Sequence, residues 1–186
     1  LDPGEDTKTI EIADSLWSSL LETGADRKSL IINLGGGVVT DLGGFVASTF
    51  KRGIDFIHIP TTLLGQVDAA IGGKTGVNLE YSKNQVGTFA HPLFVYTDSQ
   101  FLKTLPEREL ISGLAEVVKY GLIADKSLFS LLKDKDSLIA NFDVLISTSI
   151  KLKEEFVVAD FKETGERKKL NFGHTIGHAV ESYFMG

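Results

Sequence analysis

The chain has 186 residues, of which 42% are hydrophobic and 24% charged, with a net charge of −6 at pH 7 and no cysteine. These fractions are typical of a globular protein, and the negative charge argues against a nucleic acid or an anionic membrane as partner. No apolar run approaches the roughly 18 residues that a membrane helix needs. Without cysteine, disulfides and thiolate metal sites are excluded, so nitrogen and oxygen atoms must hold any metal.

The first hundred residues have the pattern of an α/β protein. A short continuous apolar run is typical of a buried parallel strand, and helical spacing of apolar residues predicts the segments between such runs. A strand, a glycine-containing helix and a second strand make one βαβ unit. The expected elements are a helix over 10–23, a strand over 29–34, a glycine turn over 35–37, a helix over 38–50, and strands over 55–60 and 92–98.

The remaining residues predict helices alone. From Glu107 onward the apolar positions recur at helical spacing, with no strand-like run. We therefore expect a nucleotide-binding, Rossmann-like α/β portion over residues 1–100, followed by an all-α metal- and substrate-binding portion over residues 101–186. The chain starts in a polar turn without methionine, and its only methionine is Met185. We expect it to be a piece of a longer protein in which both portions are truncated.

Two glycine clusters suggest that the α/β portion binds an anion. Gly35, Gly36 and Gly37 follow a buried strand and precede a helix, where a diphosphate could meet the helix N-terminus. The spacing "GGGVVTD" is not the G-x-G-x-x-G fingerprint, so tight strand–helix packing explains this turn equally well. The second cluster, "IGGKTGVN", carries Lys74 beside two glycines, and two such loops favour a nucleotide ligand.

A histidine pair suggests a metal site. "LNFGHTIGHAVE" places His174 and His178 four residues apart, on one face of a helix. A catalytic zinc usually has three protein ligands, and Glu116 is the best further candidate because a lone carboxylate among small and apolar residues would be costly. The alternative is a Glu116–Lys119 ion pair beside two histidines that bind no metal.

Five segments in order carry a resemblance to a known family. They are "LGGGVVTDLGGFVASTFKRGI", "IPTTLLGQVDAAIGGKTGVN", "KNQVGTF", "FLKTLPERELISGLAEVVKYG" and "ETGERKKLNFGHTIGHAVE". Over nearly its whole length the chain resembles the 3-dehydroquinate synthase family of sugar-phosphate cyclases. The resemblance implies a cytoplasmic, homodimeric, two-domain enzyme that uses NAD and a divalent metal, zinc or cobalt. It would convert the sugar phosphate 3-deoxy-D-arabino-heptulosonate 7-phosphate to 3-dehydroquinate and phosphate, in the shikimate pathway.

The implied chemistry fits these residue types. NAD transiently oxidises a substrate alcohol to a ketone, which the metal polarises as a Lewis acid. The ketone acidifies the adjacent C–H bond, so that phosphate can leave by elimination. The hydride then returns, and an intramolecular aldol step closes the carbocycle. A cluster of cations is needed to bind the substrate's phosphate and carboxylate.

The resemblance also assigns residues. It makes Glu116 and His174 metal ligands and moves His178 to the catalytic group, while the family's further histidine ligand, in an "HGEAV"-like segment, has no match in this chain. The implied catalytic and substrate-contacting residues are Arg52, Asp68, Lys74, Asn84, Lys119, Lys153, Arg167, Asn171 and His178. The implied NAD contacts are Glu5, Lys8, Gly37, Val38, Asp41, Thr61, Thr62, Lys74, Lys83, Phe101, Leu102, Lys103 and Thr104.

Other interpretations remain open at this level. Lys153 and Arg167 lie in charge-rich stretches that could be solvated surface, and we expect His58 and His91, which match no motif, to be structural. Related cyclases that make inosose or valiolone rings would share the cofactor loops. Metal-dependent alcohol dehydrogenases share the expected architecture but would release a reduced cofactor. A nucleotide-binding fragment without activity is the non-enzymatic alternative.

Overall fold

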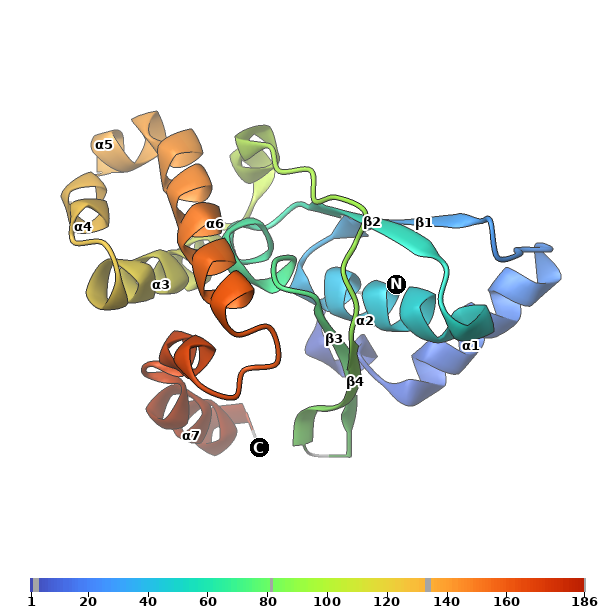
Figure 1. The fold of residues 1–186 in the computed structure, drawn as a ribbon. Helices are drawn as coiled ribbons and strands as arrows, with labels where there is room; N and C mark the ends of the chain where they lie inside the picture. The colour runs from blue at the N-terminus through green and yellow to red at the C-terminus, as the bar shows by residue number, and fades with distance from the viewer. Residues whose placement is uncertain (2–3, 81, 133–134, 186) are drawn as a thin grey trace.

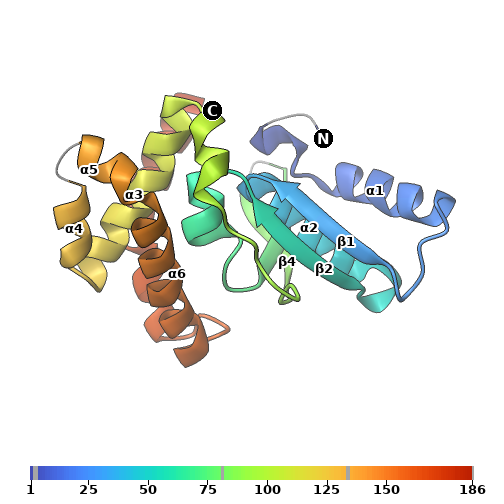
Figure 2. The ribbon, with the colours of Figure 1, turned by 90° about the horizontal axis from the view of Figure 1, so that it is seen from above.

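The computed structural model describes residues 1, 4–80, 82–132 and 135–185, although for residues 135, 136, 178, 181, 182, 184 and 185 the side chains are not described. The strands and their covering helices lie at one side of the molecule, and the later helices gather at the other (Figures 1 and 2). Among the described helices, none is long and apolar enough to cross a membrane.

A βαβ unit forms the centre of the first part, as expected. Helix α1 (Ile10–Glu22) leads to strand β1 (Leu30–Gly35), helix α2 (Gly37–Thr49), the 3-10 turn η2 (Phe50–Arg52) and strand β2 (Asp55–Pro60). The two strands pair in parallel from Leu30↔Asp55 to Gly35↔Pro60. Because parallel strands require a crossover, α2 packs on one face of the pair, and α1 covers α2.

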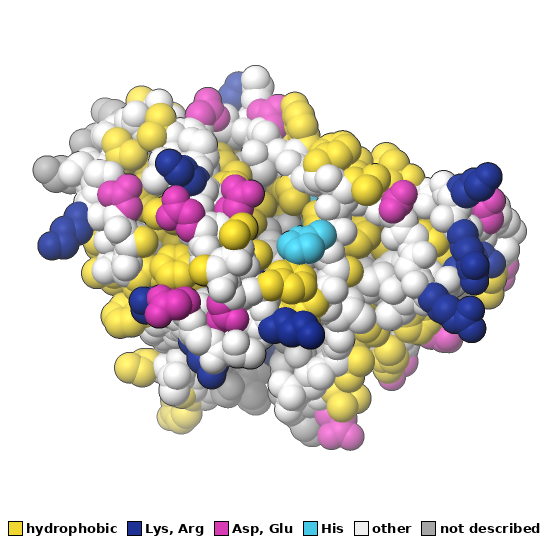
Figure 3. Space-filling view, in the orientation of Figure 1, with side chains coloured by type: hydrophobic (Ala, Val, Ile, Leu, Met, Phe, Trp, Pro, Cys, Tyr) yellow, Lys and Arg dark blue, Asp and Glu magenta, His cyan; other side chains and the backbone are white. Residues whose placement is uncertain are grey.

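The face of β1 turned away from α2 is apolar and exposed. Leu30, Ile32 and Leu34 point outward with 49–58% of their surfaces accessible. Apolar side chains also gather along the upper edge of the surface in Figure 3. Within the described residues β1 pairs with β2 alone, so its second edge is open.

The strand expected over residues 92–98 is wrong in extent. Only Val95 forms a bridge, parallel to His58, flanked by hydrogen bonds from Leu93 N to Phe56 O and from Tyr96 N to His58 O (both 2.8 Å). Pro92 has no N–H to donate, and Asp98 already caps the next helix through a bond from Gln100 N. Pairing with β2 is therefore confined to the middle of the expected segment.

A β-hairpin that the sequence did not predict follows β2. After the single-turn π-helix η3 (Gly65–Ala69), strands β3 (Lys74–Leu79) and β4 (Ser82–Phe89) pair antiparallel. Gly76 and Gly87 face each other in this ladder, and glycine is depleted in strands, which hid the pattern. The glycine cluster at residues 72–73 therefore leads into a strand.

The described elements from Ser99 onward are helical. They are η4 (Ser99–Thr104), α3 (Glu107–Ile123), α4 (Ser127–Leu131), α5 (Lys135–Ala140), α6 (Phe142–Ala159), η5 (Glu166–Asn171) and α7 (His174–Met185). The largest apolar core joins Val117, Tyr120 and Leu145 of these helices to Val67 of η3 and to Leu63 just before it. This core crosses the expected boundary near residue 100, which stays a prediction.

Candidate functional site

Asp68 is the centre of a buried polar group. The π-helix η3 brings it between α3 and α6, where Lys153 Nζ donates to its carboxylate (2.8 Å) and to its backbone carbonyl (2.6 Å). Tyr120 donates its hydroxyl to the same carboxylate oxygen (2.7 Å), and Lys119 Nζ lies 3.7 Å away. Burial alone would raise the pKa of Asp68, but the two lysines hold it well below its usual range.

The same contacts perturb the partners of Asp68. Burial lowers the pKa of Lys153, although Asp68 acts against this. Burial and the nearby Asp68 carboxylate raise the pKa of Tyr120, so its hydroxyl stays protonated and acts as a donor. Tyr120 is fully buried and was not among the predicted site residues. Its place directly after Lys119 on α3 was the signal for it in the sequence.

Glu116 and His174 lie next to each other, as the metal hypothesis requires. Glu116 Oε1 is 3.9 Å from His174 Nε2, while its other carboxylate oxygen accepts a hydrogen bond from Lys119. Ligand bonds of about 2.0–2.2 Å place two donor atoms of one metal about 3–4 Å apart, so this pair fits as two ligands. The side chain of His178 lies outside the described residues, and those that are described contain no group of three metal-binding side chains.

A second polar group surrounds Glu163, a residue outside the predicted site. Glu163 forms an ion pair with Lys74 and accepts a hydrogen bond from Asn171 Nδ2 (2.5 Å). Burial, followed by the positive charges of Arg167 and Lys153, lowers the pKa of Lys74 to about 8. Glu163 thus joins two predicted substrate contacts, and its place in the quoted "ETGERKKLNFGH" segment was the available signal.

Arg167 is buried, contrary to the solvated-surface alternative. It is 1% exposed, and its guanidinium donates to Phe161 O (2.6 Å) and to Gly72 O (3.0 Å). Gly72 has φ +98°, and a Cβ there would lie 2.5 Å from Arg167 Nη2. The glycine at this position therefore makes room for an arginine from the helical part. Lys153 is buried too, at 6% exposed.

The predicted cofactor residues form a third group at the N-terminus of α2. Gly37 and Val38 begin this helix, and Thr61 N donates to Gly35 O (2.9 Å) across the turn. Lys8 is buried and donates to Asp41 Oδ2 (2.5 Å), and Glu5 lies 3.7 Å from the same ammonium. Burial raises the pKa of Asp41, although Lys8 acts against this.

Two further predicted cofactor segments adjoin this end of the strands. Thr62 Oγ1 accepts a hydrogen bond from Gly65 N (3.0 Å), just after β2. Gln66 Nε2 donates to Pro60 O (3.1 Å) and Asp98 O (2.8 Å), which ties the strand end to the start of η4. That helix contains the predicted contacts Phe101, Leu102, Lys103 and Thr104, of which Leu102 is buried in the core.

The remaining predicted residues lie beyond the far end of α2 and on the hairpin. Arg52 follows the C-terminal end of α2, whereas the glycine turn lies at its N-terminal end, about 20 Å away for a 13-residue helix. Lys83 and Asn84 lie on β4, and both are exposed. Asn84 N donates to Asn78 Oδ1 (2.9 Å).

The other two histidines have structural surroundings. His58 is buried on β2, where its Nδ1 lies 3.2 Å from Asn33 Nδ2, and burial lowers its pKa to about 4. His91 stacks on Phe161 with ring centroids 4.6 Å apart. That stack joins the segment after β4 to the loop before η5.

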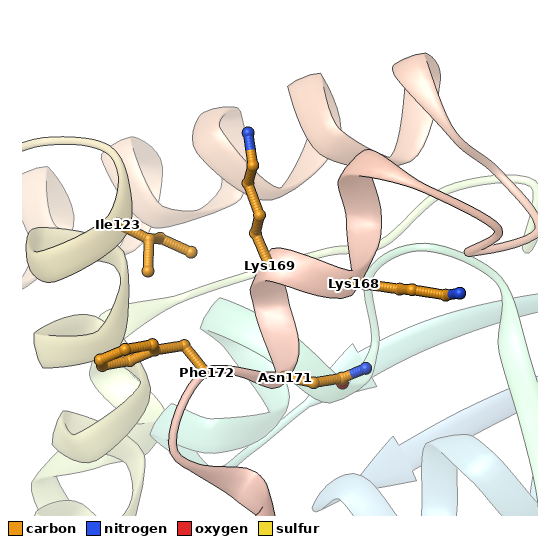
Figure 4. A pocket seen from close by; sticks show the side chains of 5 residues that line it. All are labelled: Ile123, Lys168, Lys169, Asn171 and Phe172. Atoms are coloured by element: carbon orange, nitrogen blue, oxygen red, sulfur yellow. The ribbon is translucent and has the colours of Figure 1, made fainter.

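A shallow depression of about 400 Å³ lies beside the site. It is lined by Ile123, Lys168, Lys169, Asn171 and Phe172. In Figure 4, Ile123 and Phe172 lie on one side, while Lys168 and Asn171 point to the other. Asn171 is its one member among the predicted site residues, so the depression adjoins the Glu163 group rather than enclosing the Asp68 group.

Comparisons with known proteins assign the chain to a family. The model of the 3-dehydroquinate synthase N-terminal part matches residues 1–112, and that of the C-terminal part matches residues 113–186. The chain belongs to the 3-dehydroquinate synthase family. It is 50% identical to the 3-dehydroquinate synthase of Clostridium beijerinckii over 99% of its length, and 52% identical to that of Pyrococcus abyssi over 96%. It spans about half the length of these relatives, 53% and 54% respectively.

Solved structures of related cyclases have the same fold. The 2-epi-5-epi-valiolone synthase of Streptomyces hygroscopicus, with NAD⁺ and Zn²⁺ bound, is 34% identical with a TM-score of 0.88, over 94% of this chain and 51% of that one. A 2-deoxy-scyllo-inosose synthase complexed with carbaglucose-6-phosphate, NAD⁺ and Co²⁺ is 32% identical with a TM-score of 0.89, over 97% and 51%. An iron-containing alcohol dehydrogenase of Thermotoga maritima is 13% identical with a TM-score of 0.60, over 92% and 59%, which shows the fold alone.

Proposed function

We propose that the intact protein is a 3-dehydroquinate synthase, which converts 3-deoxy-D-arabino-heptulosonate 7-phosphate to 3-dehydroquinate and phosphate. The observation that carries this proposal is the buried Asp68–Lys153–Lys119 group beside Glu116 and His174. It combines lysines that can bind an anionic substrate with one oxygen ligand, from Glu116, and one nitrogen ligand, from His174, for a divalent metal. Identity of about 50% to synthases of this name supports the same activity.

The residues at the N-terminus of α2 would hold NAD. The free N–H groups of this helix start at Gly37, where they can meet a diphosphate, and the Lys8–Asp41 pair lies beside them. When bound, NAD would accept and return a hydride, and the metal held by Glu116 and His174 would polarise the reacting oxygen. The related cyclases solved with NAD⁺ and Zn²⁺ or Co²⁺ support these assignments.

The lysines and Arg167 would bind the substrate's phosphate and carboxylate. Asp68 fixes Lys153 through two hydrogen bonds, so the cation is held in place before substrate arrives. Burial and the neighbouring cations lower the pKa of Lys74 to about 8, so its ammonium loses a proton more readily than that of an exposed lysine. The ion pair between Lys74 and Glu163 would break when an anionic substrate binds the Lys74 ammonium in place of Glu163.

The remaining assignments are part of the same proposal. The chain would comprise part of a Rossmann-like NAD-binding portion up to about residue 100 and part of a helical metal- and substrate-binding portion after it. The intact enzyme would be a cytoplasmic homodimer without a nucleic-acid partner. Arg52, Lys83, Asn84 and His178 would complete the substrate and cofactor contacts.

Phosphate release measured together with NADH absorbance tests this function. The intact protein with NAD and zinc should release phosphate from the heptulosonate phosphate without net NADH formation, because oxidation and reduction cancel. Steady NADH accumulation would instead support a dehydrogenase. Turnover of a hexose phosphate in place of the heptulosonate phosphate would support an inosose-forming cyclase, which the likeness to the inosose synthase structure makes the second candidate.

A further inference from the structure

Asn78 on β3 joins two groups of proposed ligands. Its backbone N–H donates to the carbonyl of Lys8 (2.8 Å), and its side-chain Nδ2 donates to Glu5 Oε1 (3.0 Å). Its Oδ1 accepts a hydrogen bond from the backbone N–H of Asn84 (2.9 Å). One side chain therefore contacts both the opening turn, which holds the proposed NAD contact Glu5, and strand β4, which holds the proposed substrate contact Asn84.

The contact with Asn84 lies at an irregularity of the hairpin. Between the pairs Val77↔Val86 and Leu79↔Ser82, β3 has one residue and β4 has three. The extra residues form a bulge, and bulges redirect the side chains that they carry. Asn84 has φ +55° there, in the left-handed region. The Asn78 carboxamide bonds the amide of this residue and so holds the bulge that carries Lys83 and Asn84.

The contact with Glu5 continues into the cofactor group. Glu5 lies 3.7 Å from Lys8 Nζ, and Lys8 donates to Asp41 at the start of α2. Lys8 is 3% exposed, so its position depends on these partners. A continuous series of contacts thus runs from Asp41 through Lys8, Glu5 and Asn78 to Asn84.

We propose that Asn78 is a positioning residue that couples the opening turn, which contains Glu5 and Lys8, to the β4 bulge, which contains Lys83 and Asn84. This inference rests on the proposed function. A nucleotide held by the turn fixes Glu5, and Asn78 transmits that order to the bulge. Coupling of this kind is reciprocal, so substrate contacts at Asn84 also favour cofactor binding.

Three variants of the intact protein test the coupling. Asn78→Ala removes both side-chain bonds. Asn78→Asp keeps an acceptor for Asn84 N but places a carboxylate against Glu5. Asn141→Ala is the matched control, because it removes a carboxamide that bonds Ser137 O within the helical part. The measurements are amide hydrogen exchange at Asn84 with and without NAD⁺, the Kd of NAD⁺ by calorimetry, and the KM of the heptulosonate phosphate.

In the native protein, NAD⁺ should slow exchange at Asn84. Asn78→Ala should abolish this effect and raise both the Kd of NAD⁺ and the substrate KM by about three- to tenfold, because each loses the support of one of the two hydrogen bonds. Without NAD⁺, the Asn84 amide of Asn78→Asp should exchange as slowly as that of the native protein, because an acceptor remains. Addition of NAD⁺ should not slow it further. Asn141→Ala should match the native protein in every measurement. An equal response of Asn84 to NAD⁺ in the native protein and Asn78→Ala would overturn the proposal. Failure of the native protein to release phosphate would instead overturn the proposed function, while the exchange measurement still decides the coupling.

Discussion

Lys153 on α6 is joined twice to Asp68 on η3, through the carboxylate at 2.8 Å and the backbone carbonyl at 2.6 Å. The two residues lie 85 positions apart, and their contact links the helical part to the strands. Lys153→Met should lower the free energy of unfolding by about 3 kcal/mol, because it leaves Asp68 without its main counter-charge. Urea unfolding of Lys153→Met and of the double variant with Asp68→Asn checks this. A double variant no more stable than the single one would contradict it.

Tyr120→Phe removes one hydroxyl that donates to Asp68. We expect a loss of about 1 kcal/mol in stability, because an acceptor in a buried group loses one donor. Catalysis should fall through a higher substrate KM, with the Kd of NAD⁺ unchanged. Phosphate-release kinetics and calorimetry separate the two effects, and a changed NAD⁺ affinity would assign Tyr120 a different role.

His58 should make stability depend on pH. Its folded-state pKa of about 4 lies below the unfolded value of 6.5. Between these two pH values the imidazole binds a proton in the unfolded state but not in the folded state. The contribution of His58 to the free energy of unfolding is therefore complete above pH 6.5. It declines by up to about 3 kcal/mol as the pH falls toward 4. Urea midpoints at pH 7 and pH 4.5 measure the decline, and His58→Asn should reduce it. An equal decline in both proteins would contradict the assignment.

Glu116→Gln keeps the shape of the side chain but removes the charge that would face a metal. Zinc content and activity should fall together, because Glu116 lies beside His174 in the proposed metal site. The Kd of NAD⁺ should change little, because the proposed NAD contacts lie at the N-terminus of α2. Metal analysis of the purified variant gives the answer. Full zinc occupancy would remove Glu116 from the ligand set.

The sequence by itself determined the local elements and the family. Helical spacing and short apolar runs are local signals, and they correctly predicted α1, β1, α2 and β2. The five quoted segments identified the 3-dehydroquinate synthase family, which the family models confirm.

Only the tertiary structure decided which polar residues meet. Arg167 could be read as surface until its bond to Gly72, 95 residues away, showed it buried, and the β3–β4 hairpin was hidden by its glycines. The roles of Glu163 and Tyr120 come from partners that are distant in sequence, Lys74 and Asp68. The role of Asn78 comes from its bond to the β4 bulge. Such contacts depend on how helices and strands pack across the core, and no local pattern of residues encodes that packing.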